Sequence, residues 1–490
     1  MAQIPPPPKI DSDLADYAML RDLFASSGFT LEAICGRLNI GKLSDVDPLR
    51  VRHRDCGVPA TAGDALIHLF VEGKPIEPAV LDGLIPERDL LERLKLVEPL
   101  ADGQVAATVA LYPIEYIFIA SDRYNSADGL PFEGFDELVY PCLFETTARF
   151  LRMLPRTPCG PVLDLCSGTG VAALLLAKTS EHTYAADLTD RCTKFASFNQ
   201  RMNGIVNSSV VMGDLYQPVA GLTFDRIVVH PPYQPVFRHQ QIFNSGGIDG
   251  EQITRRCIEE AYVHLRPGGR LYCVAQITAR EKPVDQRVRE WLGDQECDIG
   301  FYITKRHEIE LFAARATLTT KGSELDYREW LRAFARMGVR SLDYGLLIVE
   351  RHAEGGREPF SISRKTAEAW DPADFESSFA FEAARRSPGF EARLWTLRPR
   401  VTPSAKLEVE HGIGAEGGWQ LQHYRISESG PFEAKILASQ GLAHLLGLFD
   451  GMRSVEQCYG ELEQSGASLA RRAYVDTVVA MVSEGFLRLQ

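Results

Sequence analysis

Residues 162–170 read Val162-Leu163-Asp164-Leu165-Cys166-Ser167-Gly168-Thr169-Gly170. The apolar run followed by closely spaced glycines predicts a buried strand that turns sharply into a helix over 171–179. Gly168 and Gly170 allow the backbone to approach a ligand without a Cβ clash, beside the N-terminus of that helix. The turn alone does not decide the ligand, because dinucleotide-binding folds use the same arrangement.

Two further acidic residues follow the next predicted strands. Asp187, 23 residues after Asp164, ends a strand over 183–186, where its carboxylate is placed to accept both hydroxyls of a ribose. Asp214 closes a strand over 209–212 and is placed to accept the exocyclic amine of an adenine, or else it is a solvated carboxylate at a turn. Ligands of open α/β sheets bind at these strand ends, which favours a shared site for all three acids.

The fourth predicted strand, over 224–229, runs directly into His230-Pro231-Pro232-Tyr233. Neither proline has an N–H, and both restrict φ, so the turn is rigid and the Pro231 carbonyl can accept a hydrogen bond from a substrate. Tyr233 offers a ring face for a planar acceptor or for the wall of its path. This turn favours methyl transfer over hydride transfer.

The block from Tyr140 to Ala275 resembles the S-adenosylmethionine (SAM) methyltransferases of the protein-glutamine N5 (HemK-type) and ribosomal-RNA small-domain group. Further matching stretches are 199–204, 246–250 and 265–269. The resemblance implies SAM as cofactor and no metal, with Asp164 near the amino group of its methionine portion. The implied cofactor residues are Asp164, Cys166, Gly168, Gly170, Asp187, Asp214 and His230.

His230 departs from the family pattern, which has Asn or Asp at this position. In the family that side-chain oxygen, with the carbonyl equivalent to that of Pro231, holds an amine or amide nitrogen. A neutral imidazole has one donor and one acceptor, so His230 could hold an N–H, act as general base towards a hydroxyl or similar acceptor, or simply bond its own loop. The departure weighs against a glutamine side chain as the acceptor.

The expected catalytic residues are therefore His230, Pro231 and Tyr233. The expected walls of the substrate pocket are Tyr140, Phe144, Pro232, Phe237, His239 and Phe243. The aromatic residues among them are more typical of the core or of a lid than of catalytic groups, whereas His239 is also a candidate second base.

The chain is predicted to fold as three domains. A winged-helix-like domain over 11–123 should end in a strand pair within Val105 to Ala120, and its basic residues at 50–54 are either a solvated face or a nucleic-acid contact. A Rossmann-like α/β methyltransferase domain over 130–353 should contain seven strands and an insertion at 304–341 that shapes the pocket. A linker over 354–402 precedes a PqqD-like winged-helix domain over 403–490, a module that holds a peptide in some pathways but more often serves packing or dimerisation.

The strands expected in the central domain are 162–165, 183–186, 209–212, 224–229, 270–275, 298–303 and 342–349. Within the insertion, Ser323 with Asp326 three residues on predicts a capped helix start.

Composition restricts the partners. The 66 Asp and Glu residues exceed the 53 Lys and Arg residues, giving a net charge of −13, which disfavours nucleic acid unless a basic patch is segregated. The ten cysteines show no zinc-site spacing, and neither a signal peptide nor a membrane span is evident, so a cytoplasmic enzyme is expected.

The sequence therefore predicts a methyltransferase acting on nitrogen or oxygen of a small or peptide-like specialised substrate. One rival is methylation of a protein side chain or an RNA base. The other is a SAM-binding scaffold without transferase activity.

Overall fold

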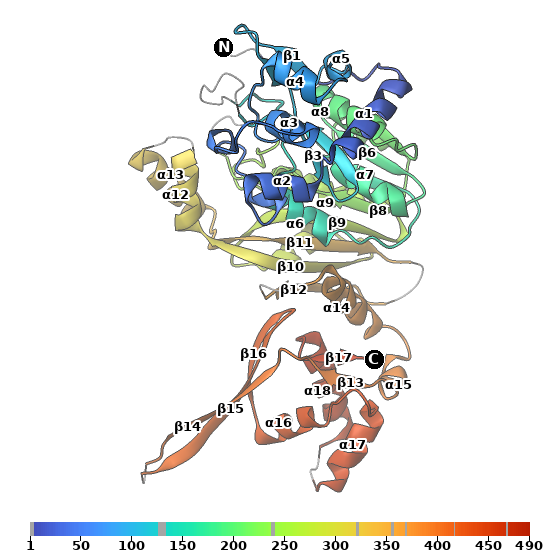
Figure 1. Ribbon diagram of the computed structural model, residues 1–490. Helices are drawn as coiled ribbons and strands as arrows, with labels where there is room; N and C mark the ends of the chain where they lie inside the picture. Colours follow the sequence, from blue (N-terminus) through green and yellow to red (C-terminus); the bar gives the residue numbers. More distant parts are fainter. Residues whose placement is uncertain are drawn as a thin grey trace. The chain divides into compact units, whose positions relative to one another are not determined.

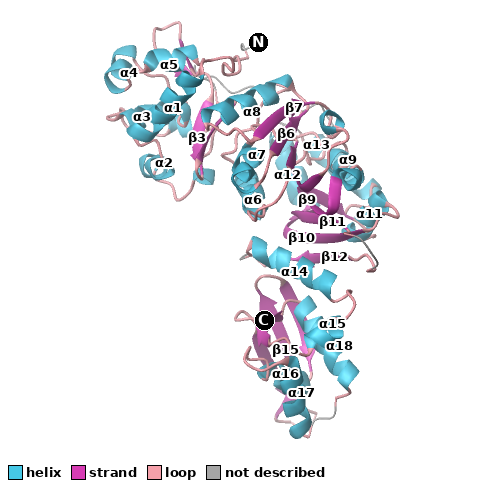
Figure 2. Cartoon of the chain, turned by 90° about the vertical axis from the view of Figure 1, so that its right-hand side faces the viewer, coloured by secondary structure: helices cyan, strands magenta, loops and turns pink. Residues whose placement is uncertain are grey.

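The computed structural model describes residues 4–125, 134–236, 241–319, 323–353, 357–367, 370–415, 417–466 and 469–490. The chain forms two compact units, Met1–Gln276 and Ile277–Gln490, and the division falls within one long strand, β9. Figure 1 labels the elements along the chain, and Figure 2 shows the distribution of helices and strands. Among the described residues, no helix is long and apolar enough to cross a membrane.

The first unit opens with helices and a short strand pair. The elements are α1 (Leu14–Ser27), α2 (Leu31–Leu38), α3 (Ala62–Phe70), α4 (Pro78–Leu84), α5 (Arg88–Arg93), β1 (Val97–Pro99) and β2 (Val105–Ala107), with 3-10 turns at Leu43–Asp45 and Val51–His53. Gly28 ends α1 in the left-handed conformation that glycine adopts readily. The winged-helix assignment stays a prediction.

The sequence predicted a strand pair within Val105 to Ala120, and β3 (Ala110–Ile114) and β4 (Ile117–Ser121) form an antiparallel hairpin there. The first residues of the run form β2, which pairs with β1 instead. Asn199 holds this hairpin against helix α8 (Asp190–Met202), because its side-chain amide both accepts from the Ala120 N–H at 2.8 Å and donates to the Ala120 carbonyl at 2.9 Å. The position of this hairpin thus depends on the Asn199 side chain, about 80 residues away in the sequence. The alternation of side chains within the hairpin could not show that contact.

Five parallel strands follow in the first unit, in the order β9-β8-β5-β6-β7. They are β5 (Val162–Leu165), β6 (Thr183–Asp187), β7 (Ser208–Met212), β8 (Phe224–Val229) and β9 (Leu265–Ala279). Helices α6 (Glu145–Met153), α7 (Val171–Leu176, continued by a 3-10 turn at Ala177–Thr179), α8, α9 (Gln252–Glu259) and α10 (Ala261–His264) accompany them, with another 3-10 turn at Gln217–Val219. The chain order reverses between β5 and β8, and such a switch point opens a crevice at the carboxyl ends of the strands.

The second unit adds α11 (Val284–Leu292), β10 (Cys297–Glu308), α12 (Ile309–Thr319), α13 (Glu324–Arg336), β11 (Ser341–Arg351) and β12 (Ser361–Lys365). Strands β10 and β11 are antiparallel, and β12 runs parallel to β10. Ser323 and Asp326 form the expected capping box at the start of α13. That the insertion shapes the substrate pocket stays a prediction.

The sheet contains eight strands, in the order β12-β10-β11-β9-β8-β5-β6-β7, where the sequence predicted seven. All seven expected strands are present. The eighth, β12, comes from the segment expected to be a linker, as do helices α14 (Pro372–Ala384) and α15 (Phe390–Leu394). Because β12 reads Ser-Ile-Ser-Arg-Lys and is only partly buried, it lacks the apolar run that marks an inner strand.

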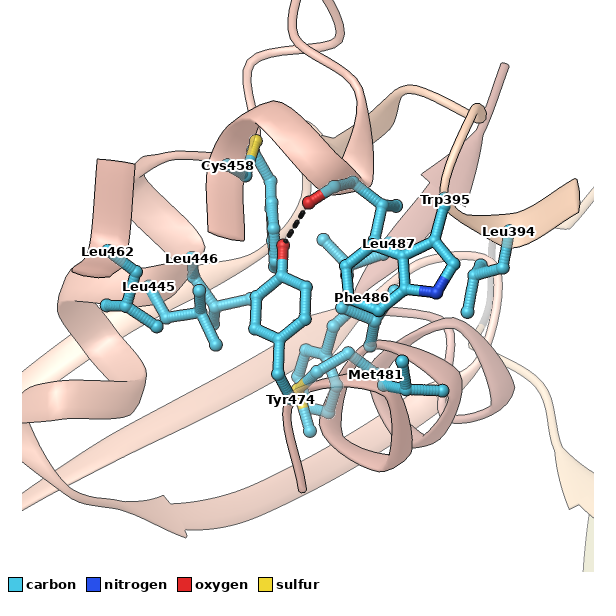
Figure 3. Packing of buried hydrophobic residues seen from close by; sticks show 14 of the residues in the cluster. Leu394, Trp395, Leu445, Leu446, Cys458, Leu462, Tyr474, Met481, Phe486 and Leu487 are labelled. Carbon is cyan, nitrogen blue, oxygen red and sulfur yellow. Dashed lines mark hydrogen bonds between the residues drawn. The ribbon is translucent and has the colours of Figure 1, made fainter. Parts of the chain in front are cut away.

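The C-terminal module has its own core (Figure 3). Its elements are β13 (Pro399–Val401), β14 (Lys406–Ile413), β15 (Trp419–Ser429), β16 (Glu433–Ala438), α16 (Gln440–Gly447), α17 (Val455–Gln464), α18 (Arg471–Ser483) and β17 (Leu487–Leu489). The buried Tyr474 hydroxyl donates to the Val455 carbonyl at 2.8 Å, and Trp395 stacks on the Tyr474 ring. Leu394 and Trp395, expected in the linker, therefore belong to this core.

Candidate active site

A cavity of about 470 Å³ lies in the first unit, where β5, β6 and β8 end. The sequence-predicted residues that line it are Tyr140, Asp164, Cys166, Gly168, Asp187, Asp214, His230, Pro231, Pro232, Tyr233 and Phe243. Gly170 and Phe144 do not line it. Phe237 and His239 lie outside the described residues.

The glycine-rich turn is held against the end of β6 by Asp187. Its Oδ2 atom accepts a hydrogen bond from the Gly168 N–H at 2.8 Å, and burial raises the pKa of this carboxyl. Gly168 and Cys166 both have positive φ, 53° and 54°. Asp187 thus shapes the loop in addition to facing the cavity.

Gly170 lies where the start of α7 packs against α8. It has φ of 76°, and a Cβ placed on it would lie 3.1 Å from the Ala196 Cβ of α8. The residue thus lets the start of α7 approach α8 closely, and its expected cofactor contact stays a prediction.

Asp164 is a buried carboxylate, 2% exposed, at the carboxyl end of β5. Its Oδ2 atom accepts from the Ala173 N–H in the first turn of α7 at 3.0 Å. Burial raises the pKa of Asp164 to about 8, and the nearby Asp187 carboxylate adds to the rise. Burial without a cationic partner disfavours the charged form of Asp164, and a cationic ligand group in the cavity would offset that cost. The site therefore fits the ammonium of an amino acid moiety.

Asp214 has a partner that the sequence did not reveal. Arg256, in α9, donates to both of its carboxylate oxygens, at 3.2 and 2.9 Å. The pair is partly exposed. Asp214 lines the cavity as expected, but the predicted bond to an adenine amine would have to share oxygens that Arg256 already contacts.

His230 lies between two aromatic rings. Its ring centroid is 4.9 Å from that of Phe150, in a stacked arrangement, and 5.6 Å from that of Tyr233. The Nε2 atom is buried and has no hydrogen-bond partner among the described residues. Burial lowers the pKa of His230 to about 4, so the imidazole is neutral at physiological pH.

An aromatic wall bounds another part of the cavity. Tyr140 stacks on Phe144 at 4.6 Å between ring centroids, and its ring lies 4.7 Å from that of Phe243. Tyr124 contacts both Tyr140 and Phe144 edge to face. Phe144 therefore packs behind Tyr140, and its expected role as a wall of the substrate pocket stays a prediction.

Several lining residues escaped the sequence analysis, among them Thr146, Thr147, Phe150, Gln234 and Asn244. The loop carrying Asn244 folds back on the Pro-Pro-Tyr turn, since the Gln234 N–H donates to the Asn244 carbonyl at 3.1 Å. A Cβ on Gly250 would lie 2.5 Å from the Tyr233 carbonyl oxygen. The glycines at 246, 247 and 250 were the available signal for this close approach.

Comparison with known proteins shows which family this chain resembles. Residues 144–299 match the family described as Methyltransferase small domain. A protein of Methanocaldococcus jannaschii named as a protein N5-glutamine methyltransferase is 30% identical over 135 residues, covering 26% of this chain and 68% of that protein. The chain belongs to the HemK-type class I methyltransferases.

Other relatives of this methyltransferase match over less of their length. A release factor glutamine methyltransferase of Thermodesulfovibrio yellowstonii is 29% identical over 124 residues, covering 23% of this chain and 44% of that protein. The chain thus spans less than half of that relative. A crystal structure of a methyltransferase from Pyrococcus furiosus is 19% identical, covers 46% of this chain and 90% of its own, and has a TM-score of 0.28.

The cofactor of this family is SAM, and the donor set of the cavity suits it. Asp164 is a buried acceptor and Asp187 a half-buried one, at the ends of adjacent strands. Among the described residues, no group of three or more His, Cys, Asp or Glu side chains is arranged to hold a metal ion.

Proposed function

We propose that this protein transfers the methyl group of SAM to a nitrogen or oxygen of a small-molecule or peptide-like substrate. The observation that carries the proposal is that the buried Asp164 carboxylate and the whole His230-Pro231-Pro232-Tyr233 turn line one cavity. The carboxylate suits the cationic cofactor, and the rigid turn suits an acceptor held beside it. SAM supplies an electrophilic methyl group, and the protein supplies the positions of the two partners.

On the cofactor side, Asp164 would hold the ammonium group and Asp187 the ribose hydroxyls. The Gly168 loop, already bonded to Asp187, would lie along the cofactor backbone. Both carboxylates are desolvated, which strengthens their interaction with a cationic ligand.

On the acceptor side, the neutral state of His230 supports a positioning role over a general-base role. A group whose pKa is about 4 takes a proton poorly near neutral pH. It can still accept or donate one hydrogen bond and, packed between Phe150 and Tyr233, it is fixed in orientation. His230 and the Pro231 carbonyl would then aim the acceptor lone pair at the methyl group.

The charge of the cavity supports a neutral or cationic acceptor over a polyanion. Its described lining contains five acidic side chains and no Lys or Arg: Asp136, Glu137, Asp164, Asp187 and Asp214. Arg256 offsets the charge of Asp214, and Asp164 carries a charge near neutral pH only when a cationic ligand is bound. A phosphate backbone needs cationic contacts, and the net charge of −13 adds to the repulsion. A ribosomal-RNA base is therefore the less favoured acceptor.

A second candidate function is methylation of a protein glutamine side chain. It is favoured by the names of the relatives from Thermodesulfovibrio yellowstonii and Methanocaldococcus jannaschii. A side-chain amide presents an N–H to an acceptor, which the Pro231 carbonyl can provide. His230 replaces the usual Asn or Asp, and this favours the first candidate.

The decisive experiment incubates the full chain with methyl-labelled SAM and a cell lysate, then separates protein, RNA and small molecules. We expect label in the small-molecule or peptide fraction. Label confined to intact proteins would select the second candidate, and label in RNA would contradict both. SAM binding without any release of S-adenosylhomocysteine would show a scaffold instead of an enzyme.

A further inference from the structure

The two ring nitrogens of His230 have different surroundings. Nε2 is buried and has no hydrogen-bond partner among the described residues. The residue as a whole is only half-buried, and it lines the cavity. Because solvent does not reach Nε2, Nδ1 is the ring nitrogen that a ligand in the cavity can meet.

The aromatic rings beside His230 do not replace the missing partner of Nε2. An imidazole N–H lies in the plane of its own ring, so it points at a neighbouring π face only when the two ring planes are steeply inclined. Phe150 stacks on His230 with 25° between the planes, and Tyr233 is inclined by 36°. An Nε2–H group would therefore run along these ring faces instead of pointing at them.

The burial of Nε2 determines where the imidazole proton lies. Burial lowers the pKa of His230 to about 4, so the ring carries one proton near neutral pH. In folded proteins an N–H buried without a partner is rarer than an acceptor in the same state. The neutral ring thus keeps a lone pair on Nε2 and presents Nδ1–H to the cavity as a hydrogen-bond donor.

The next residue, Pro231, contributes the opposite polarity. It lines the same cavity, and its carbonyl accepts no backbone hydrogen bond from the described residues. A carbonyl oxygen can only accept. The turn therefore offers a substrate one donor and one acceptor, whereas the Asn or Asp oxygen of the family pattern, with this carbonyl, would offer two acceptors.

The hydrogens and lone pairs of the methyl-accepting atom must match this pair. A hydroxyl oxygen has one hydrogen for the Pro231 carbonyl and two lone pairs, one for Nδ1–H of His230 and one for the methyl group. An amine nitrogen has a single lone pair, and accepting from Nδ1–H would leave none for methyl transfer. The nitrogen of a primary amide carries two hydrogens and needs two acceptors.

His230 and Pro231 are not suited to take a proton from the substrate. The accessible nitrogen of His230 already carries a hydrogen, and a carbonyl oxygen is not a base near neutral pH. An aliphatic alcohol needs a base to become a nucleophile, whereas an acidic hydroxyl ionises readily by itself. The rings of Tyr140 and Phe243, 4.7 Å apart between centroids, line the cavity and suit the planar group that carries such a hydroxyl.

We propose that the methyl-accepting atom is the oxygen of an acidic hydroxyl group, phenolic or enolic, so that this protein is an O-methyltransferase. The inference rests on the proposed function and narrows its acceptor. An oxygen lone pair forms the new O–C bond while the C–S bond of SAM breaks, and the electron pair of that bond stays on sulfur to give S-adenosylhomocysteine. The hydroxyl proton, held by the Pro231 carbonyl, leaves to water.

Nitrogen-15 NMR of the histidine-labelled full chain tests the donor role of His230 without any substrate. We expect a protonated Nδ1 and an unprotonated Nε2, in a signal that the His230→Asn variant lacks. The matched reference is His264, whose Nδ1 lies 3.1 Å from the Leu222 carbonyl and must be its donor. A proton on Nε2 of His230 overturns the proposal.

The chemistry of the transferred methyl group tests the acceptor atom. The full chain is incubated with methyl-labelled SAM and a cell lysate, and the product is treated with mild alkali, which releases methyl esters, and then with hot hydriodic acid, which turns methyl ethers into volatile methyl iodide. We expect the label to resist the alkali and to leave with the acid.

Label that resists both treatments is bound to nitrogen, and label released by alkali was on a carboxylate. Either result overturns the inference and leaves the proposed function standing. The absence of any labelled product overturns both.

Discussion

Replacing Asp164 with Asn should stabilise the free protein while abolishing its response to SAM. Burial raises the pKa of Asp164 to about 8 from a usual value of 3.8. At about 1.4 kcal/mol per unit, keeping this carboxyl protonated at pH 7, where the unfolded chain would ionise it, costs up to about 4 kcal/mol of folding free energy. Asn keeps an acceptor oxygen for the Ala173 N–H and carries no charge.

The direction in which the free energy of unfolding changes with pH follows from the two pKa values of Asp164. Below about pH 4 the carboxyl is protonated in both the folded and the unfolded protein, so it costs nothing. Between there and about pH 8 the unfolded chain releases its proton while the folded protein keeps it, so the free energy of unfolding falls as pH rises. Above pH 8 both states are ionised and the cost is constant.

Denaturant unfolding of the two proteins without SAM, at about pH 5 and about pH 8, measures the effect. The advantage of Asp164→Asn should grow by up to about 3 to 4 kcal/mol between these values. SAM should raise the stability of the wild type and leave the variant unchanged. The matched control is Asp190→Asn, an exposed carboxylate paired with Lys194, which should show no such slope. Parallel pH curves for wild type and Asp164→Asn would refute the reasoning.

Three further substitutions separate the roles of the site residues. His230→Ala should lower turnover at least tenfold while SAM affinity by calorimetry changes little, and His230→Asn, which keeps a hydrogen-bonding side chain but cannot act as a base, should retain most of the turnover; an equal loss in both variants would contradict the positioning role. Asp187→Asn should weaken SAM binding about tenfold or more, because it loses a charged acceptor for the Gly168 N–H; unchanged affinity by calorimetry would contradict this. Gly170→Ala should destabilise the fold by about 1–2 kcal/mol through its positive φ and the contact with Ala196, and an unaltered melting temperature would argue against that packing role.

Much of the site could be predicted because its signals are local. An apolar strand followed by an acid or by the Pro-Pro-Tyr turn is visible within ten residues, and parallel strands bring such ends to one edge of a sheet. Asp164, Asp187 and His230 were placed in this way. The packing contacts of Phe144 with Tyr140 and of Gly170 with Ala196 could not be predicted, because neither residue type shows on which side of a packed layer its position lies.

The sequence by itself determined where along the chain the seven predicted strands lie, which acids stand at the ends of three of them, and that His230 departs from the family pattern. These features could be read because periodicity and turn chemistry depend on neighbours along the chain. Only the tertiary structure decided that Arg256 pairs with Asp214, that β12 joins the sheet and that the imidazole of His230 is neutral. These properties depend on desolvation and on partners distant in sequence. Burial sets the charge state of a side chain, and burial exists only once the chain has folded.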